Sequence, residues 1–483
     1  MVTRHRAAVV AVLALSASAS AAFLAAAALR RLNFDEALAL RSGWLLLAGI
    51  PAEPPFAMPF TILLGALAHA AADPGTVFLL ARLVVALAVL SALAVLAIRT
   101  AGSSAEAAAT VLFTLLQAGF FVHGLEFRYD AAILVSLLLA IPLLARGREP
   151  DFVVLGVFSG WLATHHIKGL FLGGVLLALA AVRGRGGRRA LVRLLAGAAA
   201  AAGIWFAVAA ALGIGGAALG VYRSFLDVSV QPEVRAGLWE SLRAAFLRDA
   251  AWWVAALVAL VTTFADLRRR PAEEALRAPG LWAALLSVAS FAFTALHPHP
   301  WPYLLSLPAP FLALLMSRWL AGLRPRARRT ALAAFVLAFA AQGLTSSPPL
   351  SAHFASFRAS RSTQVETLRL LRAVSWPGDT ILDPSGMAYF LPPCSRQWYL
   401  DTLFGEAARR GAWMADLPSA LPEGCTWILD TYRLQWLPRA AWTRTAGRYV
   451  VARGSLALRA GDPRLAAARS WPPLPPGALE SFW

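Results

Sequence analysis

The sequence predicts a polytopic α-helical membrane protein that ends in a small α/β domain. Hydrophobic residues make up 59% of its 483 residues, only 14% are charged, and the mean hydropathy is +0.63. A soluble globular protein does not need so large an apolar fraction. From about residue 345 serine, proline, tryptophan and charged residues become more frequent, and no further span-length apolar run follows. We therefore expect a transmembrane module over residues 1–344 and an extracytoplasmic α/β domain over residues 345–483.

Apolar runs predict about eleven helices that cross, or nearly cross, ~30 Å of hydrocarbon. They lie at residues 7–29, 76–98, 105–122, 130–145, 152–164, 167–182, 190–212, 250–266, 279–296, 301–317 and 329–344. Basic residues are concentrated in alternate loops, which orients such a chain with those loops inside. The inner loops are expected at 99, 146–148, 183–193, 268–277 and 318–329, with the N-terminus cytoplasmic. The expected location is the bacterial inner (plasma) membrane.

The net charge of +18 does not indicate a nucleic-acid partner. The arginines cluster in short loops between apolar spans, which is a topology signal. The lipid bilayer is the partner that this composition predicts. Lys168 is the only lysine in the sequence, whereas arginine serves the other basic positions.

Two adjacent carboxylates, Asp35 and Glu36, follow the first apolar run. Residues 16–19 resemble a signal-peptidase site, but the run continues past them, so we expect a retained anchor. In either case Asp35 is expected outside. One interpretation is structural: Asp35 caps a helix that starts at Glu36. The other is chemical, because a carboxylate beside the bilayer can serve as a general base for a hydroxyl.

Further polar residues are expected at the outer ends of the spans. Ionisable groups at membrane depth are costly, so a functional role is the first hypothesis for them. Simple ion pairing among Glu126, Arg128 and Asp130 is the alternative there, and a proline-rich helix end at 297–302 is the alternative for the last group. The candidates are Glu53, Glu126, Arg128, Asp130, His165, His166, Lys168, Arg223, His297, His299 and Tyr303.

The stretch 164–169 divides an apolar run into two short spans. If 152–182 were one span, the arginines at 183–193 would fall outside, so the chain is expected to re-emerge near Lys168. Irregular backbone at membrane depth is tolerated where it lines a cavity. Gly169 allows close backbone approach. The paired histidines leave a divalent metal open, but their spacing alone does not define a site, and no other cofactor is expected.

Several segments are expected outside the membrane. Residues 36–48 and 213–249 have the amphipathic pattern of interfacial helices. In the C-terminal domain we expect a helix at 361–374 and strands at 380–382, 426–429, 449–452 and 456–458, the last two forming a hairpin. Cys394 and Cys425, the only cysteines, are expected to form a disulfide there, with two buried thiols as the alternative.

This order of features resembles the GT-C membrane glycosyltransferases, in particular the protein O-mannosyltransferase and lipid A aminoarabinose transferase group. The resemblance rests on the Asp35-Glu36 loop, the motif Glu126-x-Arg128-x-Asp130, the broken helix with Lys168-Gly169, the Pro/Tyr-rich turn near 300, and the soluble C-terminal domain. It covers most of residues 1–345, and the later residues weakly.

The resemblance implies an activity and roles for residues. It implies transfer of a sugar from a polyprenyl-phosphate donor to an acceptor hydroxyl on a lipid, glycan or protein. Asp35, with Glu36 beside it, is then the acid/base region, and Lys168 helps to hold the lipid phosphate. Related sequences often carry His-Pro-Pro in the first loop, where this chain has Glu53-Pro54-Pro55. That difference puts a metal or acceptor role of the loop in doubt.

Two other classes of function stay open. A transporter or flippase would show two similar halves and polar groups in mid-span. Here the polar residues fall at span ends and no halves match. A non-catalytic assembly protein of the same fold would tolerate the loss of Asp35.

Overall fold

The computed structural model describes residues 2–50, 57–71, 73–185, 187–226, 232–297, 301–342, 362–383, 385–394, 425–429, 448–453 and 456–470. The chain divides into two compact units. The first comprises residues 1–28, 82–207 and 229–356, and the second comprises residues 29–81, 208–228 and 357–483. Residues 29–81 thus group with the segment from residue 357 onward. The helices α1 (Val2–Leu29), α4 (Pro74–Thr100) and α10 (Arg188–Ala211) have residues in both units.

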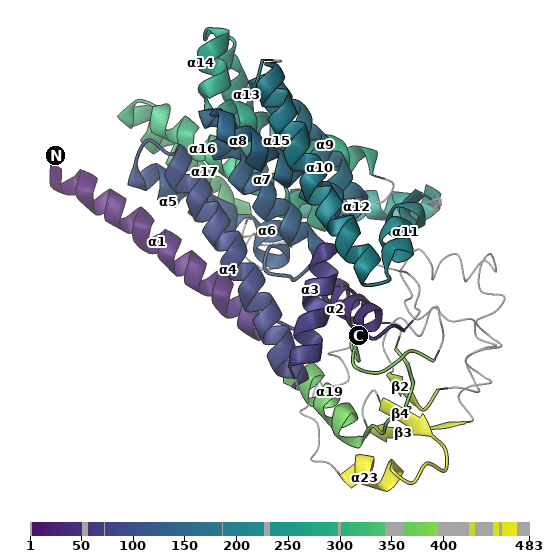
Figure 1. Cartoon of the computed structure of the whole chain (residues 1–483). Coiled ribbons are helices and arrows are strands. Elements are labelled where there is room, and N and C mark those ends of the chain that lie inside the picture. Colours follow the sequence, from purple (N-terminus) through teal and green to yellow (C-terminus); the bar gives the residue numbers. More distant parts are fainter. Residues whose placement is uncertain are drawn as a thin grey trace. The chain divides into compact units, whose positions relative to one another are not determined.

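The first unit is a bundle of helices that pack along their lengths (Figure 1). Neighbouring pairs in it include α8 with α9, α5 with α16, and α13 with α16. Its further elements are α5 (Ser104–Leu116), α6 (Ala118–His123), α7 (Tyr129–Arg146), α8 (Glu149–Ala163), α9 (His166–Arg183), α10 (Arg188–Ala211), α12 (Pro232–Arg248), α13 (Ala250–Leu267), α14 (Ala272–Arg277), α15 (Pro279–Leu296), the 3-10 helix η1 (Pro302–Ser306), α16 (Ala309–Gly322) and α17 (Pro325–Gln342).

Among the described residues, eight helical segments are long and apolar enough to cross a membrane. The expectation of a polytopic membrane protein is therefore confirmed, but three of the expected spans are not of this kind. The run 105–122 breaks at Gln117, between α5 and α6. Helix α8 has 15 residues, and α17 begins with several arginines that shorten its apolar part.

Glycines set the close packing of α8, α9 and α10. A Cβ atom on Gly156 would lie 2.1 Å from the carbonyl oxygen of Leu194, and one on Gly160 would lie 2.2 Å from that of Ala198. The helix backbones therefore touch, which is the packing expected where lipid supplies no hydrophobic force between helices. Helix α8 of the broken pair is thus in direct backbone contact with α10.

The second unit contains α2 (Phe34–Leu47), α3 (Pro59–Ala70), α11 (Gly215–Leu226) and a small α/β domain. The domain has α19 (Ser362–Val374), β1 (Ile381–Leu382), β2 (Trp427–Leu429), β3 (Tyr449–Arg453), β4 (Leu456–Arg459) and α23 (Leu465–Ser470). Its sheet has the order β1-β2-β4-β3. Strand β1 pairs parallel to β2, and β4 pairs antiparallel to both β2 and β3. The expected helix, strands and hairpin are therefore present.

Candidate active site

Buried charged side chains and a tyrosine hydroxyl, from three elements of the first unit and the residues before α7, meet around Lys168. The ammonium of Lys168 lies 2.6 Å from a carboxylate oxygen of Asp130 on α7 and donates to the hydroxyl of Tyr303 on η1 at 3.2 Å. Arg128 extends the network, with 3.3 Å to Asp130 and 3.5 Å to Glu126. The Lys168 side chain is 1% exposed. Two cations and two carboxylates thus share one enclosed place, and the expected pairing of Arg128 with its acidic neighbours occurs.

Aromatic faces enclose the cations of this network. The Lys168 nitrogen lies 4.7 Å from the ring centre of Tyr129 and 4.6 Å from that of Tyr303. The guanidinium of Arg128 lies 3.8 Å from the Tyr303 ring centre. A cation over an aromatic ring is attracted by the ring quadrupole, most strongly where water is excluded. Tyr129 was not among the candidate residues predicted from the sequence, although it lies within the Glu126–Asp130 motif.

Local backbone geometry explains how Lys168 reaches this place. Helix α8 ends at Ala163 and α9 begins at His166, which has a φ of 60° in the left-handed region that favours glycine. The ring of His166 stacks on Tyr129 with centres 4.7 Å apart. A Cβ atom on Gly169 would lie 2.1 Å from the carbonyl oxygen of Leu162, so only glycine fits. The expected break and the expected close approach are both present.

His165 and His166, adjacent in the sequence, have different surroundings. The Nδ1 of His165 lies 2.8 Å from the carbonyl oxygen of Trp161, so this nitrogen carries the hydrogen and donates it. Burial lowers the pKa of His165 to about 4, although the bond to Trp161 acts to raise it. His165 is therefore neutral at physiological pH, and Nε2 is an acceptor. The expected role of His165 as a ligand of the donor phosphate stays a prediction.

Asp35 and Glu36 lie in the first turn of α2, in the second unit. The structure corrects the expected cap: Asn33 is the N-cap residue, and its side chain accepts a hydrogen bond from the Asp35 amide at 3.2 Å. Glu36 completes the capping box by accepting from the Asn33 amide at 2.8 Å. Glu36 is fully buried, whereas Asp35 is partly exposed. Capping is thus the task of Asn33 and Glu36, and Asp35 lies at the N-terminus of a helix whose dipole favours an anion.

The remaining candidates differ in how far the structure describes them. His297 ends α15, is buried, and packs on Phe293 with ring centres 5.0 Å apart. Glu53, His299 and the side chain of Arg223 lie outside the described residues. Within the described ranges, no three His, Cys, Asp or Glu side chains come together as a metal site would require. In the C-terminal domain, the structure joins Cys394 and Cys425 by a disulfide.

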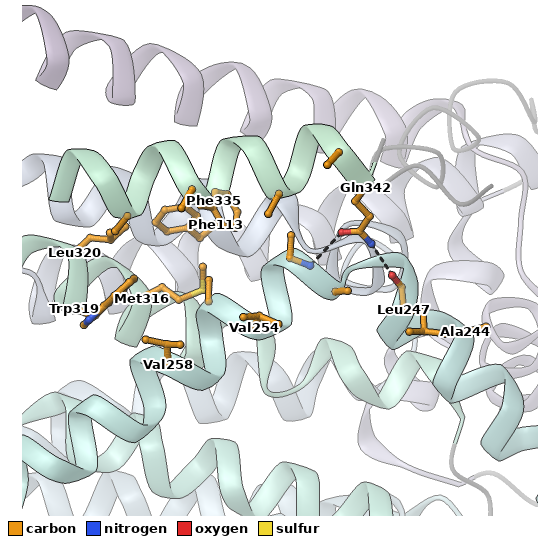
Figure 2. A pocket seen from close by; sticks show the side chains of 17 residues that line it. Phe113, Ala244, Leu247, Val254, Val258, Met316, Trp319, Leu320, Phe335 and Gln342 are labelled. Atoms are coloured by element: carbon orange, nitrogen blue, oxygen red, sulfur yellow. Dashed lines mark hydrogen bonds between the residues drawn. The ribbon is translucent and has the colours of Figure 1, made fainter. Parts of the chain in front are cut away.

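The first unit also contains an apolar pocket of about 970 Å³ between α13, α16 and α17 (Figure 2). Its walls are mainly alanine and larger apolar side chains such as Val254, Met316 and Phe335. Among the described lining residues, Gln342 carries the one side-chain amide. The Gln342 amide donates to the Leu247 carbonyl at 2.6 Å and accepts from the Ala251 amide at 3.1 Å. The pocket therefore presents hydrocarbon surface to an occupant.

Comparison with known proteins shows the fold. No protein-family model matches the sequence, and no curated protein matches it. The crystal structure of ArnT from Cupriavidus metallidurans bound to undecaprenyl phosphate is similar over 78% of this chain and 74% of that one, with 17% identity and a TM-score of 0.50. The Archaeoglobus fulgidus oligosaccharyltransferase is similar over 91% of this chain and 72% of that one, with 13% identity and a TM-score of 0.46, too weak to add to the conclusion. The chain has the GT-C fold that its sequence motifs predict.

Proposed function

We propose that the protein transfers a sugar from a polyprenyl-phosphate donor to an acceptor hydroxyl at the outer face of a bacterial inner membrane. The observation that carries the proposal is the enclosed network of Lys168, Arg128 and Tyr303 at the end of broken helix α9. Ionisable side chains buried among membrane spans are costly, so a functional role is the first hypothesis for this network, whose cations pair with Glu126 and Asp130 within the protein. The ArnT structure of the same fold holds undecaprenyl phosphate.

The donor phosphate is assigned to Lys168 and Arg128. Two cations stabilise the charge that accumulates on the phosphate as the sugar leaves. The carboxylates of Glu126 and Asp130 orient both cations before the donor arrives, and the hydroxyl of Tyr303 fixes the ammonium. His166, in the first turn of α9 with Lys168, stays a candidate ligand of the donor phosphate. Glu53, Arg223, His297 and His299 stay candidates for binding the sugar or the acceptor.

Asp35 is assigned as the general base. It removes the proton of the acceptor hydroxyl while the acceptor oxygen bonds to the anomeric carbon. The bond between that carbon and the phosphate oxygen breaks, and polyprenyl phosphate leaves with both bonding electrons. Attack from the face opposite to the phosphate inverts the anomeric centre. Asp35 is partly exposed at the start of α2, so an acceptor can reach its carboxylate.

The hydrocarbon tail of such a donor requires an apolar surface within the membrane. The pocket between α13, α16 and α17 offers one, since its single amide is bonded to backbone groups of the protein. Because the tail would otherwise lie among equally apolar lipid chains, the pocket would hold it by van der Waals packing. We assign this pocket to the polyprenyl chain.

Loss of the gene tests the proposal most directly. A deletion strain should accumulate a polyprenyl-phosphate sugar and lose one sugar modification from its envelope glycans, lipids or proteins. Mass spectrometry of both fractions, with the wild-type gene restored as control, identifies donor and acceptor together. Accumulation of the donor on the inner leaflet would instead favour a flippase. An unchanged set of lipid-linked sugars and envelope modifications would favour a non-catalytic assembly protein.

A further inference from the structure

The C-terminal domain holds the backbone directly before the proposed base. The Leu32 amide donates to the side-chain oxygen of Gln364 at 2.7 Å, and the Gln364 amide donates to the Leu32 carbonyl at 3.4 Å. Gln364 is 1% exposed and lies on α19. Leu32 immediately precedes the N-cap Asn33, so this reciprocal pair fixes the place where α2 begins.

A second contact holds α2 one to two turns further along. The guanidinium of Arg41 bonds to a carboxylate oxygen of Asp383 at 3.2 Å and to the carbonyl oxygen of Leu391 at 3.2 Å. Both Arg41 and Asp383 are fully buried. The same carboxylate accepts from the Ala388 amide at 2.7 Å. Removing one partner of this buried ion pair would leave the charge of the other uncompensated, which is strongly destabilising.

The face of α2 that carries Gly43 packs closely against α3. A Cβ atom on Gly43 would lie 1.8 Å from the carbonyl oxygen of Thr61, and one on Gly65 would lie 2.4 Å from that of Gly43. Helices α2 and α3 therefore pack backbone to backbone. We expect a helix packed in this way to shift as one body. Loss of the contact at Leu32 or at Arg41 would then also displace Asp35.

We propose that Gln364 and Arg41 are positioning residues, through which the C-terminal domain sets the position of Asp35. The inference rests on the proposed function for its effect on transfer, and on the structure of the second unit for its effect on α2. Both contacts lie within about two turns of Asp35, one on each side in the sequence. Displacement of a catalytic group by about 1 Å can lower a rate by about 100-fold.

Gln364→Met tests the first contact, because it keeps the length of the side chain and removes both hydrogen bonds. The matched control is Arg369→Ala on the same helix, which removes an exposed ion pair to Asp73 (2.7 Å). Hydrogen–deuterium exchange of the full-length protein in detergent is followed over residues 32–40. Gln364→Met should raise exchange there by at least tenfold, and Arg369→Ala should leave it unchanged. Equal exchange in Gln364→Met and wild type overturns the proposal.

Transfer is measured in membranes of the deletion strain, with its own polyprenyl-lipid extract as donor. Gln364→Met should lower the rate at saturating extract by 10- to 100-fold and leave the half-saturating amount of extract unchanged. Arg41→Lys keeps the positive charge but not the two-nitrogen guanidinium that bonds to both Asp383 and Leu391. It should retain more transfer than Arg41→Met. Wild-type rates in Gln364→Met, with Asp35→Asn inactive, overturn the positioning role alone. Full activity of Asp35→Asn overturns the proposed base, and the exchange result still decides whether Gln364 holds α2.

Discussion

At the scale of the residue, the structure separates two carboxylates that the sequence presents side by side. Glu36 is buried and completes a capping box, whereas Asp35 is partly exposed. Asp35→Asn should therefore keep expression and thermal stability but lower transfer by about 10²–10⁴-fold, the usual contribution of a general base. Glu36→Ala, which removes the oxygen that accepts from the Asn33 amide, should show the opposite balance, with a lower melting temperature as its main effect. Transfer and thermal melting of both variants check this, and normal transfer by Asp35→Asn would remove the assignment.

Lys168 makes a second prediction at this scale. A hydrogen bond to a charged group contributes about 1.5–3 kcal/mol, so Lys168→Ala should weaken undecaprenyl phosphate binding by about 10- to 100-fold. Lys168→Arg should restore it only in part, because a planar guanidinium must fit between Tyr129 and Tyr303.

Binding of undecaprenyl phosphate to the purified variants provides the measurement. Arg193→Ala serves as the control, since it removes one cation from an exposed ion pair with Glu149. If Lys168 only clamps α9 to α7 and η1, Lys168→Ala will melt at a lower temperature but bind the lipid as wild type does. That result would leave Arg128 as the phosphate ligand.

At the scale of the element, the start of α9 depends on Gly169. A methyl group there would meet the Leu162 carbonyl at 2.1 Å and push α9 away from α8. Gly169→Ala should therefore lower the melting temperature and weaken undecaprenyl phosphate binding together. Gly174→Ala, on the same helix, has no atom within 4 Å of the added carbon and should be neutral or stabilise slightly. Thermal melting of the pair decides the matter, and equal melting temperatures would contradict the packing argument.

Helix periodicity and length predicted many elements closely, and the failures have physical causes. Helix α15 begins and ends as expected, and α13 differs by one residue. The run 105–122 breaks because Gln117 accepts from the Phe120 amide and donates to Asp249, which is 132 residues away. A hydrogen-bond partner so distant in the chain as Asp249 cannot be predicted from the residues around Gln117. The close backbone approach at Gly169 was predicted correctly, because such an approach requires a glycine, which is visible in the sequence.

At the scale of the whole molecule, the sequence showed the change of composition near residue 345 but not which segments group together. Residues 29–81 belong to the same compact unit as residues 357–483. The bonds responsible, such as Gln364 to Leu32 and Arg41 to Asp383, join residues more than 330 positions apart. Their chemistry is common, so no motif marks them. The site motifs, in contrast, are local: Glu126, Arg128 and Asp130 come from one short stretch.

The disulfide makes the last prediction, because it also reports the side of the membrane on which the C-terminal domain lies. Cys394 follows β1 and Cys425 precedes β2, and the bond closes a loop with a sequence separation of 31. On the chain-entropy model such a loop contributes about 3–4 kcal/mol. Disulfides persist in oxidising compartments and are rare in the cytosol.

Protein isolated from the membrane with alkylation but without reductant should therefore carry no alkyl groups by intact mass. After reduction it should carry two. The variant with Cys394→Ser and Cys425→Ser should melt at a lower temperature, and reductant should lower the melting temperature of wild type but not of this variant. Two alkylated cysteines without reductant would place two thiols in the domain, and would argue against an extracytoplasmic position for it.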